Sequence, residues 1–195
     1  MKKKANVRRS ASHVQRRTQR PIEHWTLSVG GWTFLRMKMV AALTVSLICS
    51  IALASPPSAE PQVAEAVKAP GVSVVHLWAP WCGNCKAELK SGGWAKMVND
   101  NSQTQFVFVA IWNSGDDGRA VLKQHDIGEQ PNVMILADPG PRSGPEKLKR
   151  FLDLPVSWIP TTWVFKGGDL RYALNYGEVR FPVLQQFLED SNAEW

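Results

Sequence analysis

Two cysteines, Cys82 and Cys85, lie three residues apart in the segment VVHLWAPWCGNCKAEL. An apolar stretch precedes the pair and helix-forming residues follow it, so we expect Cys82 at the N-terminus of a helix. Unpaired N–H groups and the helix dipole favour an anion there, which predicts a pKa for the Cys82 thiol below the free value of about 8.5. The predicted chemistry is thiol–disulfide exchange, because a thiolate is the attacking species.

The second cysteine completes the predicted exchange. Cys85 follows on the same face of the expected helix, where it can attack the mixed disulfide formed by Cys82, release the substrate thiol and close an intramolecular disulfide. The dipeptide between the cysteines, Gly83 and Asn84, brings no cation. We therefore expect a moderately lowered Cys82 pKa and a reducing to intermediate potential.

Two other uses of a Cys-x-x-Cys pair remain as alternatives. Zinc prefers four ligands, and after Ala54 the only histidines are His76 and His125, so we predict no metal. A purely structural disulfide would gain little stability from closing so short a loop. Thiol–disulfide exchange therefore stays the favoured interpretation.

The segment after Gly71 alternates between strand-like and helix-like patterns. The expected strands are 72–79, 106–112, 132–137, 161–165 and 170–175, and the expected helices are 82–90, resuming near Trp94, 117–124, 145–152 and 180–189. Such alternation predicts a mostly parallel sheet with helices on both faces. Gly167 and Gly168 predict a tight hairpin that makes the end of the sheet antiparallel, and Gly92 and Gly93 predict a break in the helix that carries the cysteines.

Two motifs resemble the thioredoxin superfamily. The segment WAPWCGNC resembles its active site, and the later segment WIPTTWVF resembles its cis-proline loop. The resemblance extends from about Gly71 to Asp190 and implies an α/β, thioredoxin-like fold with a central mixed sheet and helices on both faces. The Pro-Thr-Thr triplet, the long segment before it and the exported context resemble the TlpA/ResA branch of extracytoplasmic reductases.

The resemblance also implies a substrate-binding surface. Pro160 would be cis, which proline tolerates at modest cost, and the Ile159 backbone would lie beside Cys82 to pair with an extended substrate. Trp81 and Thr161 complete the expected surface. The other large aromatic residues are expected mostly in the core because they bury large areas; they are Trp78, Trp94, Trp112, Trp158 and Trp163.

One position departs from thioredoxin, which carries a buried acid six residues before the first cysteine. Here that position is His76. A histidine could serve as the proton shuttle, because its unperturbed pKa of about 6.5 lies near working pH. A hydrogen-bonded core histidine is the alternative.

Charge and hydropathy divide the 195-residue chain near Ala54. The part up to Ala54 holds 10 Lys/Arg against 1 Asp/Glu, and the remainder holds 13 against 16, so the net charges are about +9 and about minus 3. An acidic body argues against nucleic-acid binding, and the short basic run Lys147, Lys149 and Arg150 is interpreted as the solvated face of a helix. With 44% hydrophobic residues, the composition also excludes collagen and a wholly disordered chain.

The N-terminal part is interpreted as a leader in three segments. Residues 1–36 are a basic, unstructured segment, with translation from Met37 or Met39 as an alternative start. Residues 37–54 read as a signal peptide, because a basic flank precedes sixteen uncharged residues that end in Ala52-Leu53-Ala54; a retained membrane anchor is the alternative. Residues 55–70 hold four prolines and predict an extended linker, followed by a domain at 71–195.

These observations predict an exported thiol–disulfide oxidoreductase of the bacterial periplasm or cell envelope that reduces protein disulfides. Its partners would be protein disulfide or dithiol substrates, and the resemblance to the TlpA/ResA branch implies a membrane thiol–disulfide electron donor. No cofactor is expected beyond the redox-active Cys82–Cys85 pair. A disulfide-forming oxidant or isomerase, and a non-catalytic redox-sensing binding module, are the alternatives.

Overall fold

A computed structural model describes residues 57–128, 130–175 and 177–193. The leader predictions for residues 1–54, including the signal peptide or anchor, lie outside these residues. Within the described ranges, the helices are too short or too polar to cross a membrane.

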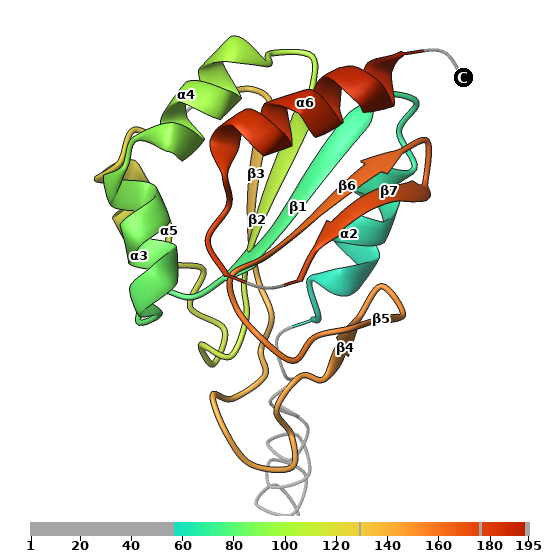
Figure 1. Ribbon diagram of the computed structural model, residues 1–195. Helices are drawn as coiled ribbons and strands as arrows, with labels where there is room; N and C mark the ends of the chain where they lie inside the picture. The colour runs from blue at the N-terminus through green and yellow to red at the C-terminus, as the bar shows by residue number, and fades with distance from the viewer. Residues whose placement is uncertain (1–56, 129, 176, 194–195) are drawn as a thin grey trace, which may run out of the picture. The chain divides into compact units, whose positions relative to one another are not determined.

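A five-stranded sheet forms the centre of the domain (Figure 1). Its strands are β1 (Val72–Trp78), β2 (Gln105–Ala110), β3 (Val133–Ala137), β6 (Thr161–Lys166) and β7 (Asp169–Leu174). They lie in the order β3-β2-β1-β6-β7, with β1, β2 and β3 parallel and β6 antiparallel to both β1 and β7. The predicted mixed sheet is therefore confirmed.

Helices cover both faces of this sheet. They are α2 (Glu60–Val67), α3 (Gly83–Lys90), α4 (Gly93–Asp100), α5 (Arg119–Lys123) and α6 (Phe181–Asn192). In Figure 1, α4 and α6 lie on one face and α2 lies on the other. All seven residues of β1 are buried, as expected for a central strand covered on both sides.

Local signals in the sequence account for most element boundaries. Gly167 and Gly168 have φ values of 60° and 92°, which fit the two-residue turn between β6 and β7. The cysteine-bearing helix stops at Lys90 and a new helix begins at Gly93, so the predicted break is confirmed. The last helix buries Leu184 and Leu188, four residues apart on one face.

The predicted linker at residues 55–70 is wrong over Glu60–Val67, which forms α2. Val63 and Val67 lie on one face of this helix and are buried against the domain. Pro61 lies in the first turn, where the missing N–H would have no helical partner. The prolines therefore flank or begin a helix, and the packed domain starts before Gly71.

The predicted helix at 145–152 is also wrong. Residues Arg150–Phe151 form strand β4, which pairs antiparallel with β5 (Leu154–Pro155). The two residues between them have φ values of 50° and 60°, which belong to a tight turn and not to a right-handed helix. The basic run Lys147, Lys149 and Arg150 is therefore not the solvated face of a helix.

A substitution at Gly118 would test the packing at the start of α5. Its φ is 66°, and a Cβ atom there would lie 2.8 Å from ring atoms of the buried Trp78 and from Pro80. We expect Gly118→Ala to lower the free energy of unfolding by about 2 to 3 kcal/mol, because it adds backbone strain and overpacks a closed contact. Urea denaturation measures this change.

Gly144→Ala is the matched control for Gly118→Ala. Gly144 also has a positive φ, 94°, but apart from its own residue and chain neighbours no heavy atom of the described residues lies within 4 Å of the added Cβ. The free energy of unfolding of the Gly144→Ala variant should therefore fall by only about 1 kcal/mol, from backbone strain. Equal losses in the two variants would contradict the packing argument.

Candidate active site

Cys82 occupies the N-cap position of α3. The backbone N–H of Cys85 donates to Cys82 Sγ at 3.3 Å, and the Lys86 N–H donates to the Cys82 carbonyl at 3.1 Å. The sulfur thus accepts one of the N–H groups that a helix leaves unpaired at its first turn. A negative charge on this sulfur would be stabilised by that N–H and by the helix dipole.

Cys82 and Cys85 are joined by a disulfide, with Cα atoms 5.3 Å apart. The two sulfurs differ in access, because Cys85 is 1% exposed and Cys82 is 7% exposed and contributes to the wall of a pocket. Cys82 is therefore the cysteine that an incoming group could reach from the pocket. The roles of attacking and resolving thiol stay predictions.

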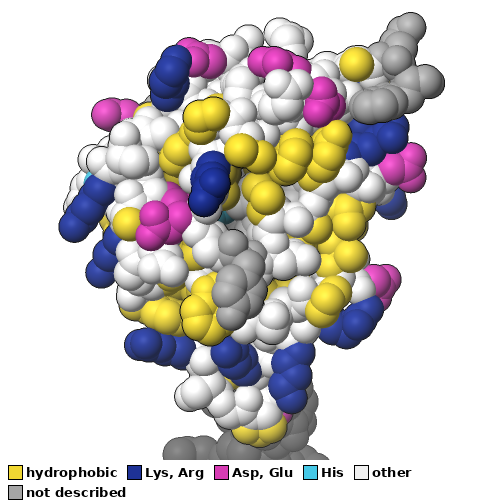
Figure 2. Space-filling model, viewed as in Figure 1, with side chains coloured by type: hydrophobic (Ala, Val, Ile, Leu, Met, Phe, Trp, Pro, Cys, Tyr) yellow, Lys and Arg dark blue, Asp and Glu magenta, His cyan; other side chains and the backbone are white. Residues whose placement is uncertain are grey.

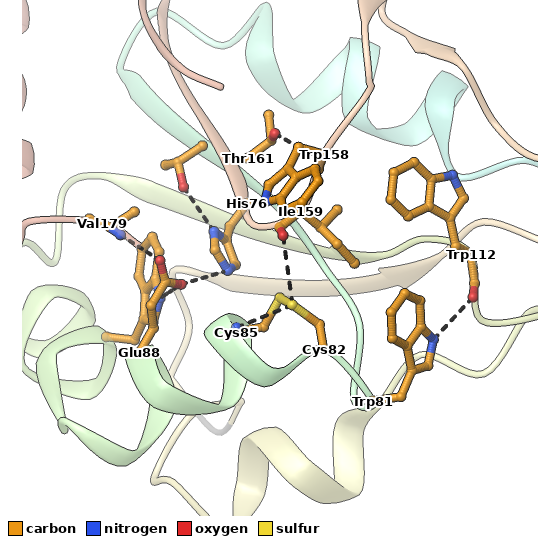
Figure 3. Close-up of a disulfide and its surroundings, with 12 residues drawn as sticks. His76, Trp81, Cys82, Cys85, Glu88, Trp112, Trp158, Ile159, Thr161 and Val179 are labelled. Atoms are coloured by element: carbon orange, nitrogen blue, oxygen red, sulfur yellow. Dashed lines mark hydrogen bonds and ion pairs between the residues drawn. A yellow bond between two sulfur atoms is a disulfide. The ribbon is translucent and has the colours of Figure 1, made fainter. Parts of the chain in front are cut away.

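The cis-proline loop lies opposite the disulfide. The Ile159–Pro160 peptide bond is cis, as the resemblance implied, and the Ile159 carbonyl oxygen lies 3.7 Å from Cys82 Sγ (Figure 3). Thr161 is buried, and its hydroxyl donates to the Trp158 carbonyl at 3.0 Å. Its side chain thus stabilises the loop through this hydrogen bond and is not among the residues that line the pocket described below.

On the inner side of the disulfide, His76 and Glu88 form a buried pair. His76 Nε2 lies 3.4 Å from Glu88 Oε2, and its Nδ1 lies 2.9 Å from Thr162 Oγ1. Glu88 also accepts from the Val179 N–H at 2.5 Å and from Trp94 Nε1 at 3.1 Å. In Figure 3, His76 lies between Glu88 and the cysteines.

Burial disfavours charge on both members of this pair. It lowers the pKa of His76 from 6.5 to about 3, and it raises the pKa of Glu88 from 4.5 to about 7 against the opposing effect of the Val179 and Trp94 hydrogen bonds. His76 is therefore neutral at neutral pH. Glu88, with a pKa of about 7, is the member of the pair that titrates near neutral pH. The proton-shuttle role of His76 stays a prediction.

A pocket of about 410 Å³ opens beside Cys82. It is lined by Trp81, Cys82, Gly83, Asn84, Trp112, Arg142, Lys147, Ser157, Trp158 and Ile159. Four residues predicted for the site beside Cys82 thus lie on its wall: Trp81, Gly83, Asn84 and Ile159. Pro160 and Thr161 are buried and are not among the residues that line it. Within the described residues, no cluster of three or more metal-binding side chains exists.

Several pocket residues were not predicted from the sequence. Trp158 was expected in the core, yet it lines the pocket and is 46% exposed; Trp112 is buried in the core as expected, at 4% exposure, and also lines the pocket. Glu88 had a usable signal, because it follows Cys85 by three residues and so lies one helical turn along the same face. Arg142 and Lys147 had none, because their position depends on how the segment between β3 and β4 folds back.

The comparisons with known proteins agree with this geometry at the level of the fold. No family model matches the chain, and no curated protein matches it. A solved structure of a putative thioredoxin from Neisseria meningitidis is similar, with a TM-score of 0.50 and 19% identity over 66% of this chain and 81% of that one. The chain has the thioredoxin fold.

Two further solved structures are similar, at lower TM-scores. A secreted Mycobacterium tuberculosis disulfide oxidoreductase homologous to E. coli DsbE gives a TM-score of 0.47 at 17% identity, covering 62% of this chain and 82% of that one. A thiol-disulfide isomerase from Corynebacterium glutamicum gives 0.47 at 18% identity, covering 67% and 86%. In this thioredoxin fold, the paired cysteines begin the helix after β1 and the cis-proline precedes β6.

The pH dependence of stability tests the charge state of the buried pair. When the chain unfolds between about pH 4.5 and 6.5, His76 gains a proton and Glu88 loses one, so the pair adds no net slope to wild-type stability. Glu88→Gln leaves only His76, which binds its proton in the unfolded chain alone. The free energy of unfolding should then rise with pH between about 3 and 6.5, by up to about 1.4 kcal/mol per pH unit.

The reverse slope is expected for His76→Asn. Only Glu88 then remains, and it keeps its proton in the folded state up to about pH 7, so stability should fall as pH rises from about 4.5 to 7. Urea denaturation across this range measures both slopes, with His125→Asn as the control that removes an imidazole elsewhere. If the free energy of unfolding changed with pH in the same direction in both variants, the assignment of two uncharged side chains to the folded state would be contradicted.

Proposed function

We propose that this chain is an exported thiol–disulfide oxidoreductase that reduces disulfides in extracytoplasmic proteins. The observation that carries the proposal is the paired placement of the two sulfurs. Cys82 contributes to the pocket wall at a helix N-terminus, whereas Cys85 is buried one turn along the same helix. The cis-proline loop facing Cys82 offers backbone to an extended substrate.

The first step begins from the reduced pair. The Cys82 thiolate attacks one sulfur of the substrate disulfide, so a Cys82–substrate bond forms, the substrate S–S bond breaks and one substrate thiolate leaves. The Cys85 N–H that points at Cys82 Sγ stabilises the attacking thiolate. A substrate held against Ile159 would present its sulfur to Cys82.

The second step resolves the mixed disulfide. Cys85 loses its proton and attacks Cys82 Sγ, which forms the Cys82–Cys85 bond and releases the second substrate sulfur as a thiolate that takes up a proton. Two electrons have then passed from the protein dithiol to the substrate disulfide. We assign the proton from Cys85 to the His76–Glu88 pair, whose carboxyl has a pKa of about 7.

The proposals of export and of a reducing direction of exchange are based on the sequence. The uncharged stretch Met39–Ala54 with its basic flank supports export, and a retained anchor in that stretch would keep the domain at the membrane surface. A Gly-Asn dipeptide between the cysteines supports a reducing potential, because it adds no cation to stabilise the thiolate form. Each turnover then requires a donor dithiol, for which we propose a membrane thiol–disulfide carrier.

Insulin reduction with dithiothreitol as electron donor tests the activity. The wild-type chain should accelerate insulin precipitation, and Cys82→Ser should lower the rate to that of dithiothreitol alone because the attacking sulfur is gone. Cys49→Ser is the matched control, which removes a cysteine outside the Cys-x-x-Cys pair. A wild-type rate equal to dithiothreitol alone would favour a redox-sensing module, and a potential near the −120 mV of strong oxidants would favour the oxidant alternative.

Trapping tests the order of attack. In a Cys49→Ser background, Cys85→Ser should accumulate mixed disulfides on Cys82, since the resolving thiol is absent, whereas Cys82→Ser should accumulate almost none. Non-reducing electrophoresis of envelope extracts, with the captured partners identified by mass spectrometry, measures both and reports the substrates. Equal trapping by the two variants would contradict the assigned roles.

A further inference from the structure

The pocket beside Cys82 carries two cations that the chemistry of exchange does not use. Arg142 Cζ lies 3.8 Å from the ring centroid of Trp81, and Lys147 Nζ lies 3.6 Å from the ring centroid of Trp112. All four side chains line the same pocket as Cys82. The cations come from the segment between β3 and β4, far from the cysteines in sequence.

Hydrogen bonds hold this arrangement in place. Trp81 Nε1 donates to the Trp112 carbonyl at 3.2 Å, and Trp112 Nε1 donates to the Leu148 carbonyl at 2.8 Å. The two tryptophans thereby tie the start of α3 to the end of β2 and to the cation-bearing segment. Trp112 has a φ of 55°, which is uncommon for a bulky residue and indicates that the surrounding contacts fix it.

The cations keep the capacity to bind an anion. A guanidinium stacked on an aromatic face still presents its N–H groups at its edge, where a carboxylate can pair with them, and an ammonium over a ring keeps outward-facing N–H groups. Because the rings already restrict both side chains, less conformational entropy is lost when an anion binds.

The described lining of this pocket holds cations without carboxylates. No Asp or Glu is among the described residues that line the pocket, and neither Arg142 nor Lys147 forms an ion pair within the described part of the chain. In Figure 2, Lys and Arg side chains gather at the lower end of the view, over the β3–β4 segment and the β4–β5 pair, with few acidic ones. The site is thus complementary to negative charge.

We propose that this pocket selects polypeptide disulfides in which an acidic residue flanks the attacked half-cystine, with Arg142 and Lys147 as the groups that bind its carboxylate. The inference rests on the proposed function and deepens it. An extended segment laid along Ile159 would place its half-cystine at Cys82, and Trp158, 46% exposed, offers apolar contact beside it. The residues that adjoin that half-cystine then meet the pocket wall.

Three short peptides test the preference. Each carries one cysteine as a mixed disulfide with 2-thiopyridine, flanked by Glu, Gln or Lys on both sides, so that attack on the peptide sulfur releases thiopyridone, which absorbs light. The pre-reduced full chain, in a Cys49→Ser background, is mixed with each peptide. Every second-order rate constant is divided by that for dithiothreitol, which corrects for the intrinsic reactivity of each disulfide.

The wild-type pocket should react about tenfold faster with the Glu peptide than with the Lys peptide at low ionic strength, as expected for one or two exposed charge pairs. Roughly 0.5 M NaCl should reduce that ratio severalfold by screening. The double variant Arg142→Gln/Lys147→Gln should bring the ratio close to one. Arg142→Lys/Lys147→Arg, which keeps both charges, should retain most of the preference.

The matched control is Lys149→Gln/Arg171→Gln. It removes the same net charge at exposed positions outside the pocket lining, so it should keep the preference. Loss of the preference in this control would assign the effect to net charge and overturn the inference. Far-UV circular dichroism and the urea midpoint of each variant report whether it is folded.

The remaining outcomes are distinguishable. Equal normalised rates for the three peptides in the wild-type chain would overturn the acidic preference and leave the proposed function standing. A folded wild-type chain that reacts with none of the peptides faster than a free thiol would overturn the proposed function and this inference together. A faster normalised reaction with glutathione disulfide than with the Glu peptide would assign the pocket to a small molecule and overturn the polypeptide assignment.

Discussion

The hydrogen bond from the Cys85 amide to Cys82 Sγ is the contact on which the chemistry of this domain depends. It exists because β1 delivers the chain to the first turn of α3 at the point where helical N–H groups lack backbone partners. The same turn leaves Cys82 at a pocket wall and buries Cys85. One local conformation therefore places Cys82 at the pocket, where its thiolate is electrostatically favoured, and buries Cys85 beside it.

The domain also buries two ionisable side chains, His76 and Glu88, and the loss of hydration shifts both pKa values toward the uncharged forms. His76 packs against the rings of Trp94 and Phe108, with centroids 4.4 and 5.6 Å away, and its burial strongly disfavours the charged form. Glu88 keeps its proton until about pH 7 for the same reason. Between about pH 4.5 and 6.5, unfolding adds a proton to His76 and removes one from Glu88, so the buried pair does not make overall stability depend steeply on pH in that range.

The pocket side of the disulfide is lined by aromatic and cationic side chains, in contrast to the buried His76–Glu88 pair. Trp81 adjoins Cys82 in sequence, but Trp112 and Lys147 reach the pocket from the end of β2 and from the β3–β4 segment. Figure 3 shows Trp81 and Trp112 on one side of the cysteines and the His76–Glu88 pair on the other. The exchange chemistry and the recognition of a partner thus use separate parts of the fold around one sulfur.

The sequence by itself determined the parts of this protein that are local. Residue spacing placed Cys82 at a helix start, β-branched runs and glycine pairs located the strands, the β6–β7 hairpin and the break after Lys90, and the WIPTTWVF motif pointed to the loop with cis Pro160. Each of these depends on backbone preferences within a few residues. The error at α2 arose because proline density outweighed the four-residue spacing of Val63 and Val67.

Only the tertiary structure decided what surrounds the sulfurs. Glu88 is buried because α3 packs it against Trp94 and the Val179 backbone, and Arg142 and Lys147 reach the pocket because the β3–β4 segment folds back over two indole rings. Trp158 is exposed and Trp163 is buried although both belong to one motif. The spacing of residues along the sequence indicates that Glu88 shares a helical face with Cys85, but burial and contact between distant segments depend on how the whole chain packs.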